Sequence, residues 1–179
     1  GDYVDSGQRR DRGVDRAAGG RRRKPGAQMH LANTCGSTVE RAAVEDAITA
    51  VLSEADRSLS GWNEHSELTR FNGSRSTDWQ AVSPALFETV SQARAVSEAS
   101  GGAFDITVGP LVRAWGFGAG APAEPAVPSE ATIARLLDQV GYARLELRAE
   151  PRALRKTLPA LMIDVDGMAP GWAVDRMAG

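Results

Sequence analysis

The apolar positions of the chain fall into runs that have the period of an α-helix. The first run consists of Val44, Ile48, Leu52, Ala55 and Leu59. Their spacings of three and four place them on one face of a helix, so the pattern predicts a long helix over residues 38–60. Ser37 and Glu40 stand three apart at its start, which is the spacing of a capping box.

Two further helices are marked by a serine before them and a glycine after them. Ser83 precedes Pro84, which suits the first turn of a helix, and that helix is expected to end at Gly101. Ser129 opens the next helix, which is expected to stop at Gly141. Their apolar stripes consist of Leu86, Val90, Ala93 and Val96 in one helix and of Ile133, Leu136, Leu137 and Val140 in the other.

Short segments rich in β-branched residues lie between the helices. Residues 103–110 predict a strand or extended turn, because the segment is too short and too β-branched for a helix. Residues 142–147 predict a short strand, and residues 155–159 a polar turn. Residues 161–165 predict another strand, followed by a helix from Trp172. Helices and short strands mixed without a βαβ rhythm favour the α+β class.

Charge divides the chain at Lys24. Residues 1–24 hold eight of the 21 Lys and Arg against four Asp, and few large apolar residues, so we expect a disordered basic tail. No aromatic residue stands between its arginines, which disfavours the alternative of a basic arm for nucleic acid or a membrane surface. Residues 25–179 form one predicted domain with a net charge of −6, so no nucleic-acid partner is expected.

The sequence has no convincing export or membrane segment. Residues 29–35 resemble a lipoprotein cleavage site before Cys35, but the apolar stretch is short and Thr34 is bulky where a small residue is needed. We therefore expect neither a signal peptide nor a lipobox in this chain. No stretch approaches the roughly 20 apolar residues of a transmembrane helix, so none is predicted.

Carboxylates stand beside glycines in two segments. Asp105 follows a Gly-Gly pair, and Asp164 and Asp166 precede Gly167. Glycine lets a ligand approach the backbone, and a carboxylate accepts hydrogen bonds from amides and sugar hydroxyls. Asp in such positions is more often a cap or turn residue than a ligand, so the residues alone leave both roles open. Trp62, in a polar loop, is a candidate to stack on a planar ring, although packing is the alternative.

Three separated segments share a wider pattern. They read SELTRFN at 66–72, GGAFDITVGPLVRAWGFG at 101–118 and IDVDGMAPGWAVD at 163–175. In order and spacing they resemble the ApbE family of FAD:protein FMN transferases, over roughly Thr38 to the last residue. The resemblance implies an α+β, ApbE-like flavin transferase fold that is truncated, with the C-terminal half of the domain absent.

The resemblance also implies an activity. Family members take FAD, use Mg²⁺ and transfer FMN to a threonine hydroxyl of a target protein, releasing AMP. An FAD pyrophosphatase, with water in place of threonine, is the alternative enzyme, and an inactive or degenerate flavin-binding fragment is the non-enzymatic alternative. The expected partners are flavin-accepting subunits of membrane redox complexes, and the expected location is the periplasmic side of the inner membrane.

Site residues follow from the resemblance position by position. The implied FAD contacts are Trp62, Ala103, Phe104, Asp105 and Asp164. The backbone carbonyl of Gly167 falls where relatives contribute to the metal site. Pro170 occupies a cofactor-contact position at which relatives carry Lys or Glu, and proline offers neither charge nor N–H there. The catalytic residues are unknown and are expected in the absent half. We expect residues 103–105 and 164–171 to form two sides of one flavin pocket.

Overall fold

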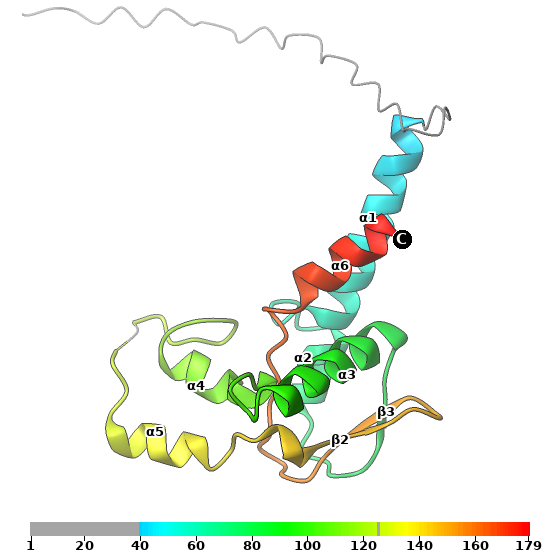
Figure 1. Ribbon diagram of the computed structural model, residues 1–179. Helices are drawn as coiled ribbons and strands as arrows, with labels where there is room; N and C mark the ends of the chain where they lie inside the picture. Colours follow the sequence, from blue (N-terminus) through cyan, green and yellow to red (C-terminus); the bar gives the residue numbers. More distant parts are fainter. Residues whose placement is uncertain (1–39, 125) are drawn as a thin grey trace, which may run out of the picture. The chain divides into compact units, whose positions relative to one another are not determined.

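The computed structural model describes residues 40–124 and 126–179 (Figure 1). The predicted basic tail at residues 1–24, the domain boundary at residue 25, the capping residue Ser37 and the lipobox-like segment at 29–35 lie outside the described residues. Within the described residues, no helix is both long and apolar enough to cross a membrane. The elements mix helices with a small sheet, so the predicted α+β class is confirmed.

The three helices predicted from periodicity are present. They are α1 (Arg41–Leu59), α3 (Pro84–Ala99) and α5 (Glu130–Leu137). The side chains of Ser83 and Ser129 cap α3 and α5 as predicted, each accepting a hydrogen bond from a backbone N–H of the first turn. Serine caps are reliable signals because they satisfy an N–H group that has no partner inside the helix.

The last helix, α6 (Ala169–Ala178), begins three residues earlier than the predicted start at Trp172. Pro170 lies in its first turn, where a missing N–H breaks no hydrogen bond. Trp172 and Ala173 are its buried residues, and α6 packs against α1 (Figure 1). A seven-residue helix that the apolar pattern did not predict, α2 (Glu67–Gly73), buries Leu68 and Phe71.

A three-stranded antiparallel sheet has the order β1-β3-β2. Its strands are β1 (Gln80–Ala81), β2 (Leu145–Arg148) and β3 (Ala153–Lys156). The strand predicted at 142–147 is confirmed as β2 for residues 145–147 and is wrong for residues 142–144, which form a 3₁₀ turn. The polar turn predicted at 155–159 is wrong for its first two residues, which belong to β3. Arg155 pairs with Glu146 across the sheet and Lys156 is buried. The two consecutive basic residues made the segment look like a polar turn, although they belong to a strand.

The strand predicted at 161–165 is wrong, and so is the strand or extended turn predicted at 103–110. Residues 106–110 instead form a 3₁₀ turn, η1 (Ile106–Val108), and the start of α4 (Gly109–Ala114). The Asp105 side chain caps η1 and Pro110 suits the first turn of α4, and these local signals outweigh the β-branched composition. Residues 161–165 alternate between buried and partly exposed positions as a strand does, but they belong to no sheet of the described chain.

One apolar core joins these elements. It contains fifteen buried residues, contributed by α1, α2, α3, η1, the sheet, the 161–165 segment and α6. Leu161, Ile163 and Val165 are each at most 2% exposed, so the segment that carries Asp164 is anchored on alternate residues. This anchoring fixes the backbone on which the candidate site is built.

Candidate functional site

A cleft of about 460 Å³ lies between two segments that are about 60 residues apart in the sequence. Residues 103–106 with Val108 line one side and residues 164 and 166–168 line another. Val112 of α4, with Phe117 and Gly118 of the following loop, completes the lining. Most of the side chains are apolar, while Asp105, Asp164 and Asp166 supply carboxylates. Residues 103–105 thus meet the first part of the predicted 164–171 segment in one cleft, whereas residues 169–171 do not line it, and flavin binding there stays a prediction.

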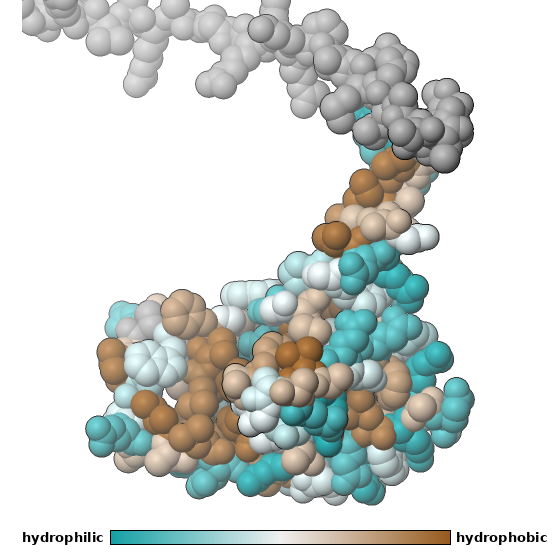
Figure 2. Space-filling model, in the orientation of Figure 1, coloured by the Kyte–Doolittle hydropathy of each residue, from teal (hydrophilic) through white to brown (hydrophobic). Residues whose placement is uncertain are grey.

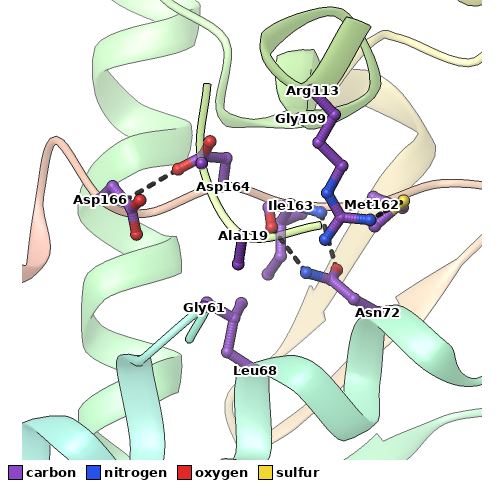
Figure 3. A pocket seen from close by; sticks show the side chains of 11 residues that line it. Gly61, Leu68, Asn72, Gly109, Arg113, Ala119, Met162, Ile163, Asp164 and Asp166 are labelled. Atoms are coloured by element: carbon purple, nitrogen blue, oxygen red, sulfur yellow. Dashed lines mark hydrogen bonds between the residues drawn. The ribbon is translucent and has the colours of Figure 1, made fainter. Parts of the chain in front are cut away.

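The position of Asp164 is set by hydrogen bonds from two other segments. The side-chain amide of Asn72 donates to the carbonyl of Ile163 at 2.8 Å and accepts from the N–H of Ile163 at 2.8 Å (Figure 3). The N–H of Asp164 donates to the carbonyl of Ile106 at 2.7 Å. These bonds take the place of a strand neighbour, which explains why residues 161–165 are extended without joining a sheet.

The start of α4 lies close against the same segment. A Cβ added at Gly109 would lie 3.6 Å from the Cβ of Asp164, so a side chain there would contact it directly. Glycine therefore allows α4 to approach the carboxylate-bearing segment closely. Val112, one turn further along α4, then reaches the cleft.

Asp105 is tied into the fold by both carboxylate oxygens. One oxygen accepts hydrogen bonds from the N–H and the hydroxyl of Thr107, each at 2.7 Å. The other accepts from the N–H of Tyr142 at 2.8 Å. Asp105 thus holds one side of the cleft to the start of the η2 turn (Tyr142–Arg144). Each carboxylate oxygen has two lone pairs, so the second oxygen retains capacity for a ligand donor.

Asp164 and Asp166 form a pair of neighbouring carboxylates. The N–H of Asp166 donates to Oδ1 of Asp164 at 3.0 Å. Burial, and then the negative charge of Asp164, raise the pKa of Asp166. Both residues also line a smaller hollow of about 30 Å³, which Arg113 borders from α4 (Figure 3). A cation placed at this pair would relieve the repulsion between the two carboxylates.

The donors of the cleft fit Mg²⁺ in chemical type but do not complete its shell. Asp164, Asp166 and Gly167 line one cleft and offer carboxylate and carbonyl oxygens. Mg²⁺ in phosphate-handling sites is commonly held by one or two carboxylates together with water and substrate phosphate oxygens. Within residues 40–124 and 126–179, no group of three or more His, Cys, Asp or Glu is arranged to hold a metal ion.

Five of the seven residues predicted from the resemblance line the cleft. They are Ala103, Phe104, Asp105, Asp164 and Gly167. Trp62 does not line it and is 73% exposed, although its neighbour Gly61 borders the small hollow. Pro170 is exposed in the first turn of α6 and does not line the cleft either. The roles of all seven as FAD or metal contacts stay predictions.

Sequence reasoning missed two residues that the structure makes prominent. The side chain of Asn72 makes two hydrogen bonds to the backbone of Ile163. The feature of the sequence that could have revealed it is its place in the SELTRFN segment. Phe117 lines the cleft and is 67% exposed. The feature of the sequence that could have revealed it is its place as an aromatic residue between the two glycines of WGFG. Neither has a charge or an apolar period, which are the features that pattern analysis detects.

Comparison with known proteins gives consistent matches over most of the chain. A model of the ApbE family matches residues 26–179. An FAD:protein FMN transferase of Vibrio cholerae is 33% identical over 167 residues, covering 87% of this chain and 49% of the relative. An FAD:protein FMN transferase of Salmonella typhimurium is 37% identical over 147 residues, which are 80% of this chain and 41% of the relative.

The fold agrees with a solved structure as well. The flavin transferase ApbE from Vibrio cholerae superposes with a TM-score of 0.73 at 31% identity, over 78% of this chain and 44% of that one. This chain therefore spans slightly less than half the length of the relatives that it matches.

Proposed function

This chain belongs to the ApbE family, and we propose that it supplies one side of the FAD-binding site of a flavin transferase. The observation that carries the proposal is the cleft of about 460 Å³ in which residues 103–105 meet Asp164 and Gly167. Its volume lies in the range of about 300–1,000 Å³ that is typical of small-molecule sites. Its relatives are named FAD:protein FMN transferases, which supports flavin transfer as the reaction.

The proposed reaction moves FMN from FAD to a threonine hydroxyl of a target protein. The threonine oxygen forms a bond to the FMN phosphorus, the bond from that phosphorus to the bridging oxygen breaks, and AMP leaves with the bridging oxygen. Mg²⁺, when bound, neutralises pyrophosphate charge and makes AMP a better leaving group. The hydroxyl proton must pass to a base, and we assign no residue of this chain to that role.

The residues of the chain divide this work by their position in the cleft. The apolar lining around Phe104, Val108 and Met168 suits the flavin ring system and excludes water from it. Asp164 and Asp166, with the carbonyl of Gly167, would hold Mg²⁺ near the phosphates. Asp105 holds its side of the cleft in place through Thr107 and Tyr142.

The acceptor and its location are part of the same proposal. Relatives are named for transfer to a protein, which supports a protein acceptor. We propose that the acceptors are flavin-accepting subunits of membrane redox complexes and that the reaction takes place on the periplasmic side of the inner membrane.

Product analysis tests the proposal against its alternatives. The chain is incubated with FAD, Mg²⁺ and a threonine-containing acceptor subunit, and the products are separated by mass. Covalent FMN on the acceptor together with AMP supports the transferase. Free FMN with AMP identifies an FAD pyrophosphatase, and bound but unchanged FAD identifies a flavin-binding fragment. Absence of FAD binding in a titration would contradict all three.

A further inference from the structure

The end of α4 holds Phe117 on a fixed backbone. The N–H of Phe117 donates to the carbonyl of Val112 at 3.0 Å, and that of Gly116 donates to the carbonyl of Arg113 at 2.9 Å. Gly116 has a φ of 85°, a left-handed conformation that glycine adopts without strain. Together these features form a Schellman motif, whose two hydrogen bonds fix the backbone of the residue after the glycine relative to the helix.

Packing within the chain does not explain the aromatic side chain of Phe117. In a Schellman motif the residue at this position commonly makes an apolar contact with the last turn of the helix. Phe117 is nevertheless 67% exposed, so most of its ring is left in contact with water. An ordered, exposed aromatic ring that lines a cleft is a feature of binding sites more than of cores.

The loop after Phe117 is folded against α4 by glycine. Gly118 has a φ of 72°, and a Cβ added there would lie 3.6 Å from Cγ1 of Val112. Gly120 has a φ of 77° and lies against the guanidinium of Arg113. The small residues after Phe117 thus lie against α4, whereas Phe117 itself contributes to the cleft.

The surroundings of Phe117 indicate what kind of ligand group it meets. Phe104, Val108, Val112 and Met168 line the same cleft and are apolar. The acidic residues Asp164 and Asp166 line it as well and suit the metal and phosphate part of a dinucleotide. Of the two planar systems of FAD, the isoalloxazine ring is the larger and has an apolar dimethylbenzene edge, whereas adenine is smaller and more polar.

We propose that Phe117 is a flavin-binding residue whose ring stacks on the isoalloxazine ring. This inference rests on the proposed function, because it assumes that the cleft binds a flavin. Aromatic side chains stack on planar rings with a preference for offset or edge-to-face geometry. A contact of this kind orients the half of FAD that is transferred and leaves the pyrophosphate at the acidic residues.

Titration with fragments of FAD tests the assignment. Riboflavin carries the isoalloxazine ring without phosphates, and ADP carries adenine and phosphates without that ring. We expect Phe117→Ala to raise the Kd for riboflavin by about tenfold, on the scale of one aromatic stacking contact. Phe117→Tyr keeps the aromatic face, so its Kd should stay within about twofold of the parent. Isothermal titration calorimetry measures the Kd of each variant for riboflavin and for ADP.

Two controls separate stacking from loss of structure. Leu137 is 53% exposed at the end of α5 and does not line the cleft, so Leu137→Ala should leave the riboflavin Kd unchanged. The thermal unfolding of Phe117→Ala should match that of the parent, because the removed ring is mostly exposed.

The outcomes distinguish the inference from the function on which it rests. If the parent binds riboflavin and Phe117→Ala binds it equally well, stacking at Phe117 is wrong while the flavin cleft stands. If Phe117→Ala weakens the binding of ADP and not that of riboflavin, the ligand ring that stacks on Phe117 is adenine, and the assignment is overturned. If the parent binds FAD but not riboflavin, the isoalloxazine ring is not held independently and the inference fails. If the parent binds no flavin, the proposed function fails, and the inference with it.

Discussion

The side chain of Asn72 makes the backbone hydrogen bonds that a neighbouring strand would otherwise make. Its amide makes two hydrogen bonds of 2.8 Å to the backbone of Ile163, which lies 91 residues further along the chain. Ile163 is 2% exposed, so its backbone groups have little access to water. One side chain therefore satisfies a buried N–H and a buried carbonyl next to Asp164, and couples the SELTRFN segment to the cleft.

Removing this amide tests the coupling. We expect Asn72→Ala to lower the free energy of unfolding by about 2 kcal/mol, because it leaves two backbone groups near the core without partners. Gln92 is an exposed amide on α3, and Gln92→Ala should change stability by less than about 0.5 kcal/mol. Urea denaturation of both variants measures the difference. Equal, small effects would show that solvent replaces the Asn72 bonds.

Filling the cleft tests the role of Ala103. Its side chain lines the cleft and is exposed, so a larger residue there occupies ligand space without disturbing the core. We expect Ala103→Leu to weaken FAD binding by at least about tenfold, which corresponds to about 1.4 kcal/mol of binding energy. Ala134 is exposed on α5 away from the cleft, and Ala134→Leu serves as the matched control. FAD fluorescence titration measures both, and unchanged binding by Ala103→Leu would place the ligand elsewhere.

Lys156 is a buried cation held by backbone carbonyls. Its Nζ donates to the carbonyl of Ser74 at 2.7 Å and to that of Asn72 at 3.4 Å, at the C-terminal end of α2. A positive charge suits that end of a helix, where carbonyl groups lack partners. Burial, and secondarily the charge of Arg75, lower the pKa of Lys156 from 10.5 to about 8.

This lowered pKa predicts a pH dependence of stability. Between pH 8 and pH 10.5 the unfolded chain binds the Lys156 proton more strongly than the folded chain does, so stability rises with pH in this window. The free energy of unfolding should rise by about 2 kcal/mol between pH 8 and pH 10. Lys156→Met removes the titrating group, so its stability subtracted from that of the parent isolates the effect. A difference that stays flat from pH 8 to pH 10 would contradict the assigned burial of the charge.

Among the elements, α2 and α3 are joined through the cap of α3. The carboxylate of Glu67, in the first turn of α2, accepts hydrogen bonds from the N–H and the hydroxyl of Ser83 at 2.9 and 2.5 Å. The hydroxyl oxygen of Ser83 in turn accepts from the N–H of Leu86 at 3.3 Å. One serine thus both caps α3 and binds the neighbouring helix, and α3 buries six residues in the core region.

The two predicted serine caps should therefore differ in importance. We expect Ser83→Ala to lower the free energy of unfolding by about 2 kcal/mol, the upper end of measured cap effects, because the Glu67 contact is lost as well. Ser129→Ala should lower it by no more than about 1 kcal/mol, since α5 has no buried residues and can fray without exposing the core. Denaturant unfolding of both variants checks the order, and a larger effect at Ser129 would contradict it.

At the scale of the whole described chain, α1 and α6 leave an apolar face exposed. A groove of about 350 Å³ is lined by Val44, Ile48 and Val51 of α1 and by Met177 of α6, among others. Leu52 and Val174 are 53% and 62% exposed. Figure 2 shows apolar surface over these two helices. Apolar surface gathered in this way favours association in water.

We expect this chain to associate with increasing concentration. The double variant Ile48→Gln with Leu52→Gln should reduce the association, because both exposed side chains belong to the predicted apolar stripe of α1. Val127→Gln, at a loop position that is 80% exposed and outside the groove, is the control. Sedimentation velocity measures the species present. A single monomeric species at all concentrations, with a sharp cooperative melt, would contradict the expectation.

Local signals were sufficient for part of this structure. The helical period of α1 and the serine caps of α3 and α5 placed three helices, because periodicity and caps depend on residues within a few positions of each other. The three matching segments identified the family, and two of them, 101–118 and 163–175, contain every residue that lines the cleft. Periodicity reports which side of a segment is buried. It does not report where the hydrogen bonds of that segment go.

The partners of these hydrogen bonds, and the assembly of the cleft, were decided by the tertiary structure. Residues 161–165 have the alternation of a strand, yet their backbone bonds go to Asn72 and Ile106, which no local pattern specifies. Lys156 was predicted in a polar turn, whereas in the structure its ammonium group donates to two backbone carbonyls at the C-terminal end of α2. Phe117 becomes a cleft residue only because the start of α4 lies against Asp164, so that the loop after α4 lines the same cleft as that residue. Contacts between segments that are distant in sequence built the site from elements whose local form the sequence had only partly indicated.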